Sequence, residues 1–209
     1  MAADATIKNV IFDMGNVLMR FDGPYFSAQF TDNEEDAAAL NRALFASPVW
    51  NLLDSGTVSY DTMLRVARAH LDERLWPNLD ACFAGWAKYS SPIEETNALV
   101  RELKDSGYGV YLLSNAGTRI HEQLDHMPAW ELMDGAVVSA EERMMKPDPA
   151  VYQLLCDRYG LEPAECLFVD DNADNCEGAR VAGMRAVRYT GDVLSLIHIS
   201  EPTRLQLIS

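Results

Sequence analysis

Five short runs of β-branched and aliphatic residues recur along this 209-residue chain, at residues 9–12, 109–113, 136–138, 166–169 and 185–188. Helical patterns separate the later runs, with apolar residues at three and four spacing over residues 93–104, 118–126, 149–159 and 174–182. Such alternation is typical of βαβ units, whose crossovers are right-handed. Because the apolar runs are nearly continuous, both faces of the strands are expected to be covered. The pattern predicts an α/β fold with a Rossmann-like parallel sheet.

The stretch between the first and second runs is far longer than one crossover helix requires. It contains three segments with helical spacing: 34–45, 59–75 and 79–88. Capping residues precede two of them, within 31–33 and 59–61. We therefore predict a helical cap at residues 22–91, inserted after the first strand into an α/β core formed by residues 1–21 and 92–194. Short hinges are expected near residues 21–23 and 89–92.

Residues 195–209 differ in character from the rest of the chain. They resemble a peptide that arises when sequencing-adapter DNA is translated by mistake, so we interpret them as a non-native tail and leave them out of the fold argument. A genuine amphipathic C-terminal segment is the alternative.

Composition excludes several classes of partner. The net charge is −15, and the few Lys and Arg residues are scattered, so no basic stripe is available to follow a nucleic-acid backbone. No apolar run approaches the roughly 18 residues of a membrane span, and no basic and apolar leader opens the sequence. The four cysteines form no C-x-x-C pair and are expected to be reduced. We expect a cytoplasmic protein, and nothing indicates its oligomeric state.

Polar clusters stand where the apolar runs end. Asp13 follows the first run, Ser114 and Asn115 follow the second, a carboxylate pair follows the fourth at 170–171, and Lys146 lies in the loop after the third. Each alone is most often a helix cap or a turn. Because ligands of open parallel sheets bind outside the carboxyl ends of the strands, all four clusters are expected at one edge. Together they indicate a site for a phosphoryl group and a divalent cation.

The run at residues 170–175 has Asp or Asn at alternate positions from Asp170, which also suggests a calcium loop. Counted from Asp170, the sixth position is Asn175, where an EF-hand needs Gly, and the twelfth is Val181, where it needs Glu. The EF-hand interpretation therefore fails. Two adjacent carboxylates facing Asp13 suit Mg²⁺, which takes one or two carboxylates and keeps waters or phosphate oxygens.

These motifs, taken in order, resemble those of the haloacid dehalogenase superfamily of hydrolases over roughly residues 7–190. The four matching segments are Phe12-Asp13-x-Gly15-Asn16-Val17, Ser114-Asn115, Lys146-Pro147-Asp148, and residues 170–175 followed by Ala182-Gly183-Met184. The first and last are most similar to the sugar-phosphate phosphatase branch, which includes α-D-glucose-1-phosphate phosphatases. The resemblance implies a Rossmann-like core with an inserted cap and a Mg²⁺-dependent phosphatase.

The resemblance also implies roles for the catalytic residues. Asp13 would be the nucleophile that forms an aspartyl-phosphate, which water then hydrolyses. Ser114 would hydrogen-bond a phosphoryl oxygen, with help from backbone amides around Met14 and Asn115. Lys146 would neutralise charge on Asp13 and on the transferring group.

Magnesium would be held at the same edge by carboxylate and carbonyl oxygens. The resemblance implies Asp13, Asp171 and the carbonyl of Gly15 as ligands. Asp170 would be either a ligand through water or an outer partner that orients the others.

Gly15 departs from the usual pattern of the superfamily. Most of its phosphatases carry a second Asp two residues after the nucleophile, as general acid and base. Such a group contributes roughly 10² to 10⁴ in rate. Gly15 is therefore expected to slow the enzyme or to restrict it to leaving groups that need less protonation, such as the hemiacetal oxygen of a sugar-1-phosphate. The related branch implies that Gly here is compatible with activity.

Other candidate residues carry weaker signals. Four cap residues could face the substrate, although Trp and Tyr in a small helical bundle more often form its core: Trp50, Asp54, Tyr60 and Trp86. Three basic residues lie near the second motif and are expected on an exposed helix face, although the first could reach a substrate: Arg119, His121 and His126.

The leading hypothesis is a Mg²⁺-dependent phosphatase for a small phosphorylated metabolite such as a sugar phosphate. A 2-haloacid dehalogenase would use the same Asp nucleophile without metal, but the carboxylates at 170–171 would then repel it. A phospho-ligand binding module without turnover is the third hypothesis. The sequence does not separate hydrolysis from phosphoryl transfer.

Overall fold

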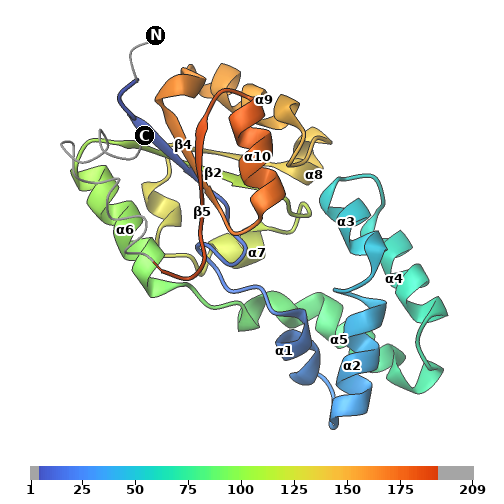
Figure 1. The fold of residues 1–209 in the computed structure, drawn as a ribbon. Helices are drawn as coiled ribbons and strands as arrows, with labels where there is room; N and C mark the ends of the chain where they lie inside the picture. Colours follow the sequence, from blue (N-terminus) through green and yellow to red (C-terminus); the bar gives the residue numbers. More distant parts are fainter. Residues whose placement is uncertain (1–4, 193–209) are drawn as a thin grey trace.

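The computed structural model describes residues 5–192, so the predicted tail at 195–209 lies outside the described residues. Five parallel strands form one sheet in the order β3-β2-β1-β4-β5 (Figure 1). The strands are β1 (Asn9–Phe12), β2 (Gly109–Ser114), β3 (Gly135–Val138), β4 (Cys166–Asp170) and β5 (Arg185–Arg188). The central strand β1 pairs Phe12 with Leu112 of β2 and with Val169 of β4. The predicted Rossmann-like α/β fold is confirmed.

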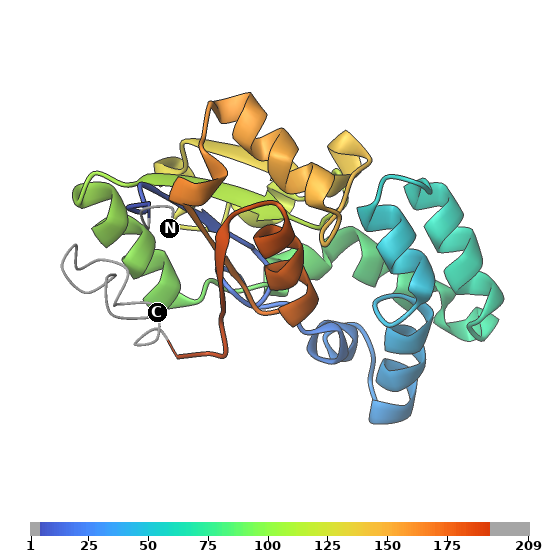
Figure 2. The ribbon, with the colours of Figure 1, turned by 45° about the horizontal axis from the view of Figure 1, so that its top comes forward.

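Both faces of the sheet are covered, as the apolar runs predicted. In β1, Val10 and Phe12 belong to one buried cluster and Ile11 to another, because successive side chains point to opposite faces. The first cluster includes residues of α6 (Glu94–Asp105) and α7 (His121–Leu124). The second includes residues of α9 (Pro149–Tyr159) and α10 (Ala173–Val181). Two helical layers therefore enclose the strands (Figure 2).

Residues 23–89, which we call the helical insertion, contain helices and no strand. These are α1 (Gly23–Ala28), α2 (Glu34–Ala43), α3 (Pro48–Asp54), α4 (Tyr60–Ala69), η1 (Glu73–Leu75), α5 (Trp76–Gly85) and η2 (Trp86–Tyr89). The insertion has its own buried cluster, which includes Phe26, Leu40, Met63 and Leu79. Both views place it beside the sheet (Figures 1 and 2). The division into two domains with hinges remains a prediction.

The expected helices differ from the observed ones mainly at their ends. Asn33 and Ser59 cap α2 and α4, as predicted. The helix expected over 59–75 ends at Ala69, and η1 begins beyond it after Asp72, whose side chain accepts the Arg74 amide. The helix expected over 79–88 begins earlier, at Trp76.

The helix expected over 118–126 is reduced to the short α7. The residues between β2 and α7 form a loop instead. This loop follows the carboxyl end of β2, where the polar clusters meet.

Candidate active site

The polar clusters converge at the carboxyl edge of the sheet. Asp13 directly follows β1, Ser114 ends β2 and Asp170 ends β4. The chain leaves β1 for β2 on one side and reaches β4 on the other, so the strand order reverses beside Asp13. One carboxylate oxygen from each of Asp13, Asp170 and Asp171 lies within 4.8 Å of the others. The predicted juxtaposition of these carboxylates is therefore observed.

Lys146 is buried between two of these carboxylates. Its Nζ donates to Asp13 Oδ1 at 2.6 Å, to Asp170 Oδ2 at 2.7 Å and to the Leu113 carbonyl at 2.9 Å. All three protons of the ammonium group are thereby used. Burial alone lowers the pKa of Lys146, but the carboxylates of Asp13 and Asp170 outweigh it and raise the pKa above its ordinary value. Lys146 is a fixed cation at this edge.

Two features hold Lys146 in place. The side chain of Asn115 accepts the Lys146 amide at 2.9 Å and donates to the Lys146 carbonyl at 2.9 Å. The loop that carries Lys146 also packs closely against α10. A Cβ on Gly178 of α10 would lie 2.2 Å from the carbonyl oxygen of Pro147, the residue after Lys146. Asn115 was predicted for its backbone amide, whereas its side chain fixes the loop that carries the lysine.

The carboxylates at 170 and 171 have different surroundings. Asp170 is fully buried and accepts hydrogen bonds from Lys146, from the Asn172 amide at 2.8 Å and from Asn175 Nδ2 at 3.0 Å. Protein donors therefore occupy both of its oxygens. Asp171 is half-buried and lines the cavity described below. Burial and the charge of Asp170 raise the pKa of Asp171, and a hydrogen bond from Asn16 opposes this.

The site carries more negative charge than its one lysine can balance. Burial raises the pKa of Asp13 to about 7, Asp170 raises it as well, and Lys146 acts in the opposite direction. Three carboxylates around one ammonium group would accommodate a second cation, which would favour their charged forms. Oxygen donors of this kind fit a hard cation such as Mg²⁺.

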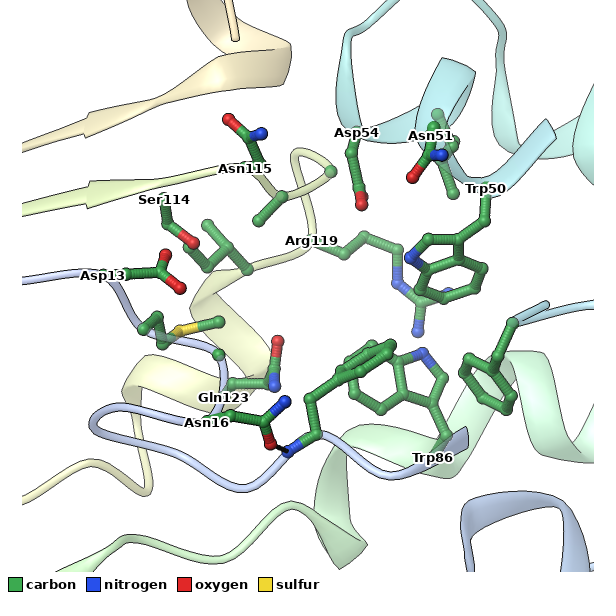
Figure 3. A pocket seen from close by; sticks show the side chains of 18 of the residues that line it. Asp13, Asn16, Trp50, Asn51, Asp54, Trp86, Ser114, Asn115, Arg119 and Gln123 are labelled. Carbon is green, nitrogen blue, oxygen red and sulfur yellow. Dashed lines mark hydrogen bonds between the residues drawn. The ribbon is translucent and has the colours of Figure 1, made fainter. Parts of the chain in front are cut away.

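The loop after β1 brings Gly15 and Asn16 beside Asp13. Asn16 adopts a left-handed backbone with φ 55°, and its side chain accepts the Phe21 amide at 3.0 Å (Figure 3). Gly15 does not have a positive φ. A Cβ on Gly15 would lie 3.9 Å from Asp13 Oδ2 and 4.0 Å from Phe21 Cβ. The backbone therefore leaves room for a side chain at position 15, directed near Oδ2 of Asp13, the oxygen that Lys146 does not hold.

A cavity of about 300 Å³ opens above this site. Its polar end includes Asp13, Ser114, Lys146 and Asp171. Its other end is largely aromatic and comes mainly from the helical insertion: Phe21, Phe45, Trp50, Tyr60, Phe83 and Trp86 (Figure 3). The cavity thus joins a charged floor to an apolar wall.

The four insertion residues singled out in the sequence all line this cavity: Trp50, Asp54, Tyr60 and Trp86. The three aromatic ones also belong to the insertion's apolar cluster or pack against it, as expected for its core, and their contact with a substrate remains a prediction. Phe21 packs against both indoles, with ring centroids 6.0 Å from Trp50 and 5.5 Å from Trp86. The phenylalanines of the wall were not predicted, because aromatic residues at helical spacing look like ordinary core.

Arg119 links the loop after β2 to the insertion. Its guanidinium donates to Glu122 at 2.6 and 2.8 Å and to the Phe83 carbonyl at 3.0 Å, and its backbone amide donates to Tyr60 Oη at 2.9 Å. The expectation of an exposed helix face was wrong for Arg119, because it precedes α7 and is partly buried. His121 and His126 are exposed, as expected.

Comparisons with known proteins agree with this geometry. Sesquiterpene phosphatase astK of Aspergillus oryzae is 27% identical over 94% of this chain and 96% of its own length. (S)-2-haloacid dehalogenase 4A of Burkholderia cepacia is 31% identical over 57% of this chain, which spans only 51% of that enzyme. The HAD family enzyme BT-2542 of Bacteroides thetaiotaomicron, solved with magnesium and inorganic phosphate, superposes with a TM-score of 0.70 at 20% identity, covering 91% of this chain and 98% of that one.

The profile of the haloacid dehalogenase-like hydrolases matches residues 7–183, from the start of the sheet to the turn after α10. The match includes all four polar clusters and the whole helical insertion. This chain therefore belongs to the haloacid dehalogenase-like hydrolases.

Proposed function

We propose that this hydrolase is a Mg²⁺-dependent phosphatase that acts on a small phosphorylated metabolite through an aspartyl-phosphate on Asp13. The observation that carries the proposal is the charge arrangement at the floor of the cavity. There, Asp13 and Asp170 pair with the buried ammonium group of Lys146, and an oxygen of Asp171 lies within 4.8 Å of theirs. A phosphoryl group in transfer needs a nucleophile, fixed positive charge and a divalent cation at one point.

The catalytic roles follow from the hydrogen bonds of each side chain. Lys146 holds Oδ1 of Asp13, which leaves Oδ2 to attack phosphorus in line with the leaving oxygen. The Ser114 hydroxyl has no partner among residues 5–192 and lines the cavity, so it is available for a phosphoryl oxygen. Backbone amides around Met14 and Asn115 are proposed as further donors. Lys146 would then offset charge on the phosphoryl group.

The proposed magnesium ligands are Asp13, Asp171 and the Gly15 carbonyl. Bound Mg²⁺ would supply positive charge to the phosphoryl oxygens. Asp170 is proposed as an outer partner, since Lys146, Asn172 and Asn175 already use its oxygens. Its task would be to hold Lys146 and, through it, Asp13.

The substrate is proposed to be a phosphate ester whose alcohol part packs against the aromatic wall. The motif resemblance favours a sugar phosphate, whose ring has an apolar face. The similarity to a sesquiterpene phosphatase along nearly the whole chain favours a terpenoid alcohol instead. Both fit a cavity walled by Phe21, Trp50 and Trp86.

Dehalogenation of a 2-haloacid is the second candidate, because the partial relatives include haloacid dehalogenases. In that reaction the Asp13 carboxylate would attack a carbon atom of the substrate, and no cation is required. Three mutually close carboxylates argue against it, because without a cation they would repel one another and the anionic substrate.

One assay separates these candidates. Inorganic phosphate is measured from glucose-1-phosphate and from a prenyl phosphate, with Mg²⁺ and with EDTA, beside halide release from 2-chloropropionate. We expect phosphate release that requires Mg²⁺ and that Asp13→Asn abolishes. Halide release without metal would support the dehalogenase, and neither product would support a binding module.

Other proposals concern the surroundings of the enzyme. No helix within residues 5–192 is long and apolar enough to cross a membrane. A cytoplasmic location and the lack of a nucleic-acid partner remain predictions.

A further inference from the structure

We propose that Asp54, at the end of α3 in the helical insertion, is the catalytic acid and base that position 15 does not provide. This inference rests on the proposed phosphatase function. Asp54 would give a proton to the leaving oxygen and would then take one from the attacking water.

The placement of Asp54 fits this task. Asp54 lines the same cavity as Asp13. Figure 3 shows both carboxyl groups pointing into this cavity, that of Asp13 from the end of β1 and that of Asp54 from α3. Asp54 lies between the charged floor and the aromatic wall. A substrate with its phosphoryl group at Asp13 and its alcohol at the wall would bring the bridging oxygen past Asp54.

The backbone of Asp54 is bonded to α8 (Ser139–Glu142), which follows β3, although Asp54 belongs to the insertion. Ser139, the first residue of α8, donates from its hydroxyl to the Asp54 carbonyl at 2.5 Å. The same hydroxyl accepts the amide of Ala116, two residues after Ser114, at 2.9 Å. Close by, a Cβ on Gly56 would lie 2.4 Å from the Ala140 carbonyl oxygen. These contacts set the position of Asp54 relative to the phosphoryl site, as a proton donor requires.

The surroundings of the Asp54 carboxyl favour a group that holds a proton near neutral pH. Burial raises the pKa of Asp54 to about 7, while hydrogen bonds from the Gly117 amide and the Trp50 side chain oppose the shift. No ion pair involves Asp54 among residues 5–192, and the nearby Arg119 is paired with Glu122. A catalytic acid works best when its pKa is near the working pH.

The other titratable groups of the cavity already have partners or roles. Both carboxylate oxygens of Glu122 accept hydrogen bonds from Arg119. Lys146 donates all its protons to the protein, and Asp171 is a proposed metal ligand. Tyr60 accepts the Arg119 amide and remains the rival donor.

The proton balance closes over the two steps. In the first, Asp13 forms a bond to phosphorus, the bond from phosphorus to the ester oxygen breaks, and the Asp54 proton moves to that oxygen, which leaves as the alcohol. In the second, the Asp54 carboxylate takes a proton from water, the new hydroxyl bonds to phosphorus, and the bond from phosphorus to Asp13 breaks. Phosphate leaves, and Asp54 is again protonated.

The test compares wild type with Asp54→Asn, which keeps the shape and the acceptor oxygen of the side chain. Rapid-mixing kinetics with Mg²⁺ would follow p-nitrophenyl phosphate, whose leaving group needs no proton, and a primary alkyl phosphate. For the variant we expect a wild-type-like burst of p-nitrophenol followed by slow turnover, and no burst of alkyl alcohol. The loss with the alkyl ester should be roughly 10² to 10⁴ in rate. Asp61→Asn, an exposed carboxylate on α4 outside the cavity, is the matched control.

Two results would overturn the inference. One is a burst of alkyl alcohol in Asp54→Asn as fast as in wild type. Loss of that burst in Tyr60→Phe would then identify Tyr60 as the proton donor. The other is an equal loss of the burst for both esters in a folded variant, which would show that Asp54 only positions the loop. If wild type releases no phosphate from either ester, the proposed phosphatase function itself fails.

Discussion

Replacing Lys146 by Met tests how strongly the site depends on its buried cation. Met is of similar length and fills the space without a charge. The change removes three hydrogen bonds, two of them to carboxylates, and leaves Asp13 and Asp170 facing each other without the ammonium group. Removing one partner of a buried ion pair typically costs roughly 3 to 5 kcal/mol. In a chain of this size, each kcal/mol lowers Tm by about 2 to 4 °C.

The loss of stability in Lys146→Met should grow as the pH rises. Without Lys146, the pKa of Asp13 rises further, because its carboxylate then faces that of Asp170 without the ammonium group between them. A group whose folded pKa is raised contributes its full stability below its unfolded pKa, about 4, and loses it as pH rises through the folded value. The free energy of unfolding that Lys146→Met loses relative to wild type should therefore be small near pH 5 and largest near pH 8.

The free energy of unfolding of wild type and variant is measured with urea at both pH values. EDTA is present so that no metal contributes. The double variant Lys146→Met/Asp170→Asn is the matched control, because it removes one of the two unbalanced charges and should recover much of the free energy of unfolding. A loss below about 1 kcal/mol near pH 8, the range of an exposed pair, would refute the reasoning. So would a deficit that does not change with pH.

Three further substitutions test the remaining parts of the site. Gly15→Asp in the Asp54→Asn background should restore part of the turnover of an alkyl phosphate, because a side chain there points near Asp13 without a clash; unchanged steady-state rates would contradict this. Asp171→Asn should raise the Mg²⁺ concentration needed for half-maximal activity more than about tenfold, which a metal titration measures. Trp86→Ala should raise KM for a prenyl phosphate more than KM for a small ester, and equal effects on both would mean that the aromatic wall does not bind the alcohol.

The polar clusters were predictable because the topology brings them together. Once alternating strands and helices predict a parallel sheet, every residue that ends a strand lies at the same edge. That rule placed Asp13, Ser114 and Asp170 correctly. Lys146 followed from its loop after β3, although a short helix intervenes.

Side-chain contacts between distant segments were not predictable. The pairing of Asn115 with the backbone of Lys146 joins residues 31 apart in the sequence, and no spacing rule reports it. The same holds for the bond from Ser139 to Asp54. Asn175 donates a hydrogen bond to the Asp170 carboxylate, and its place in the polar run after β4 was the one sequence signal for this bond.

Two helices of the insertion gave no apolar pattern, although their starts were marked. Both α1 and α3 are short, and each begins with a capping residue followed by Pro in the first turn. Asp22 caps α1 and Ser47 caps α3. Short helices show too few turns for periodicity, so caps are the better guide.

Trapping the covalent intermediate shows whether Asp13 is the nucleophile. Wild-type enzyme turning over a phosphate ester with Mg²⁺ is quenched in acid, digested at low pH, where acyl phosphates survive, and its fragments are sequenced by mass spectrometry. We expect one phosphoryl group on Asp13 and none in Asp13→Asn treated in the same way. Full turnover with Asp13 unmodified, or a phosphoryl group on another side chain, would contradict it.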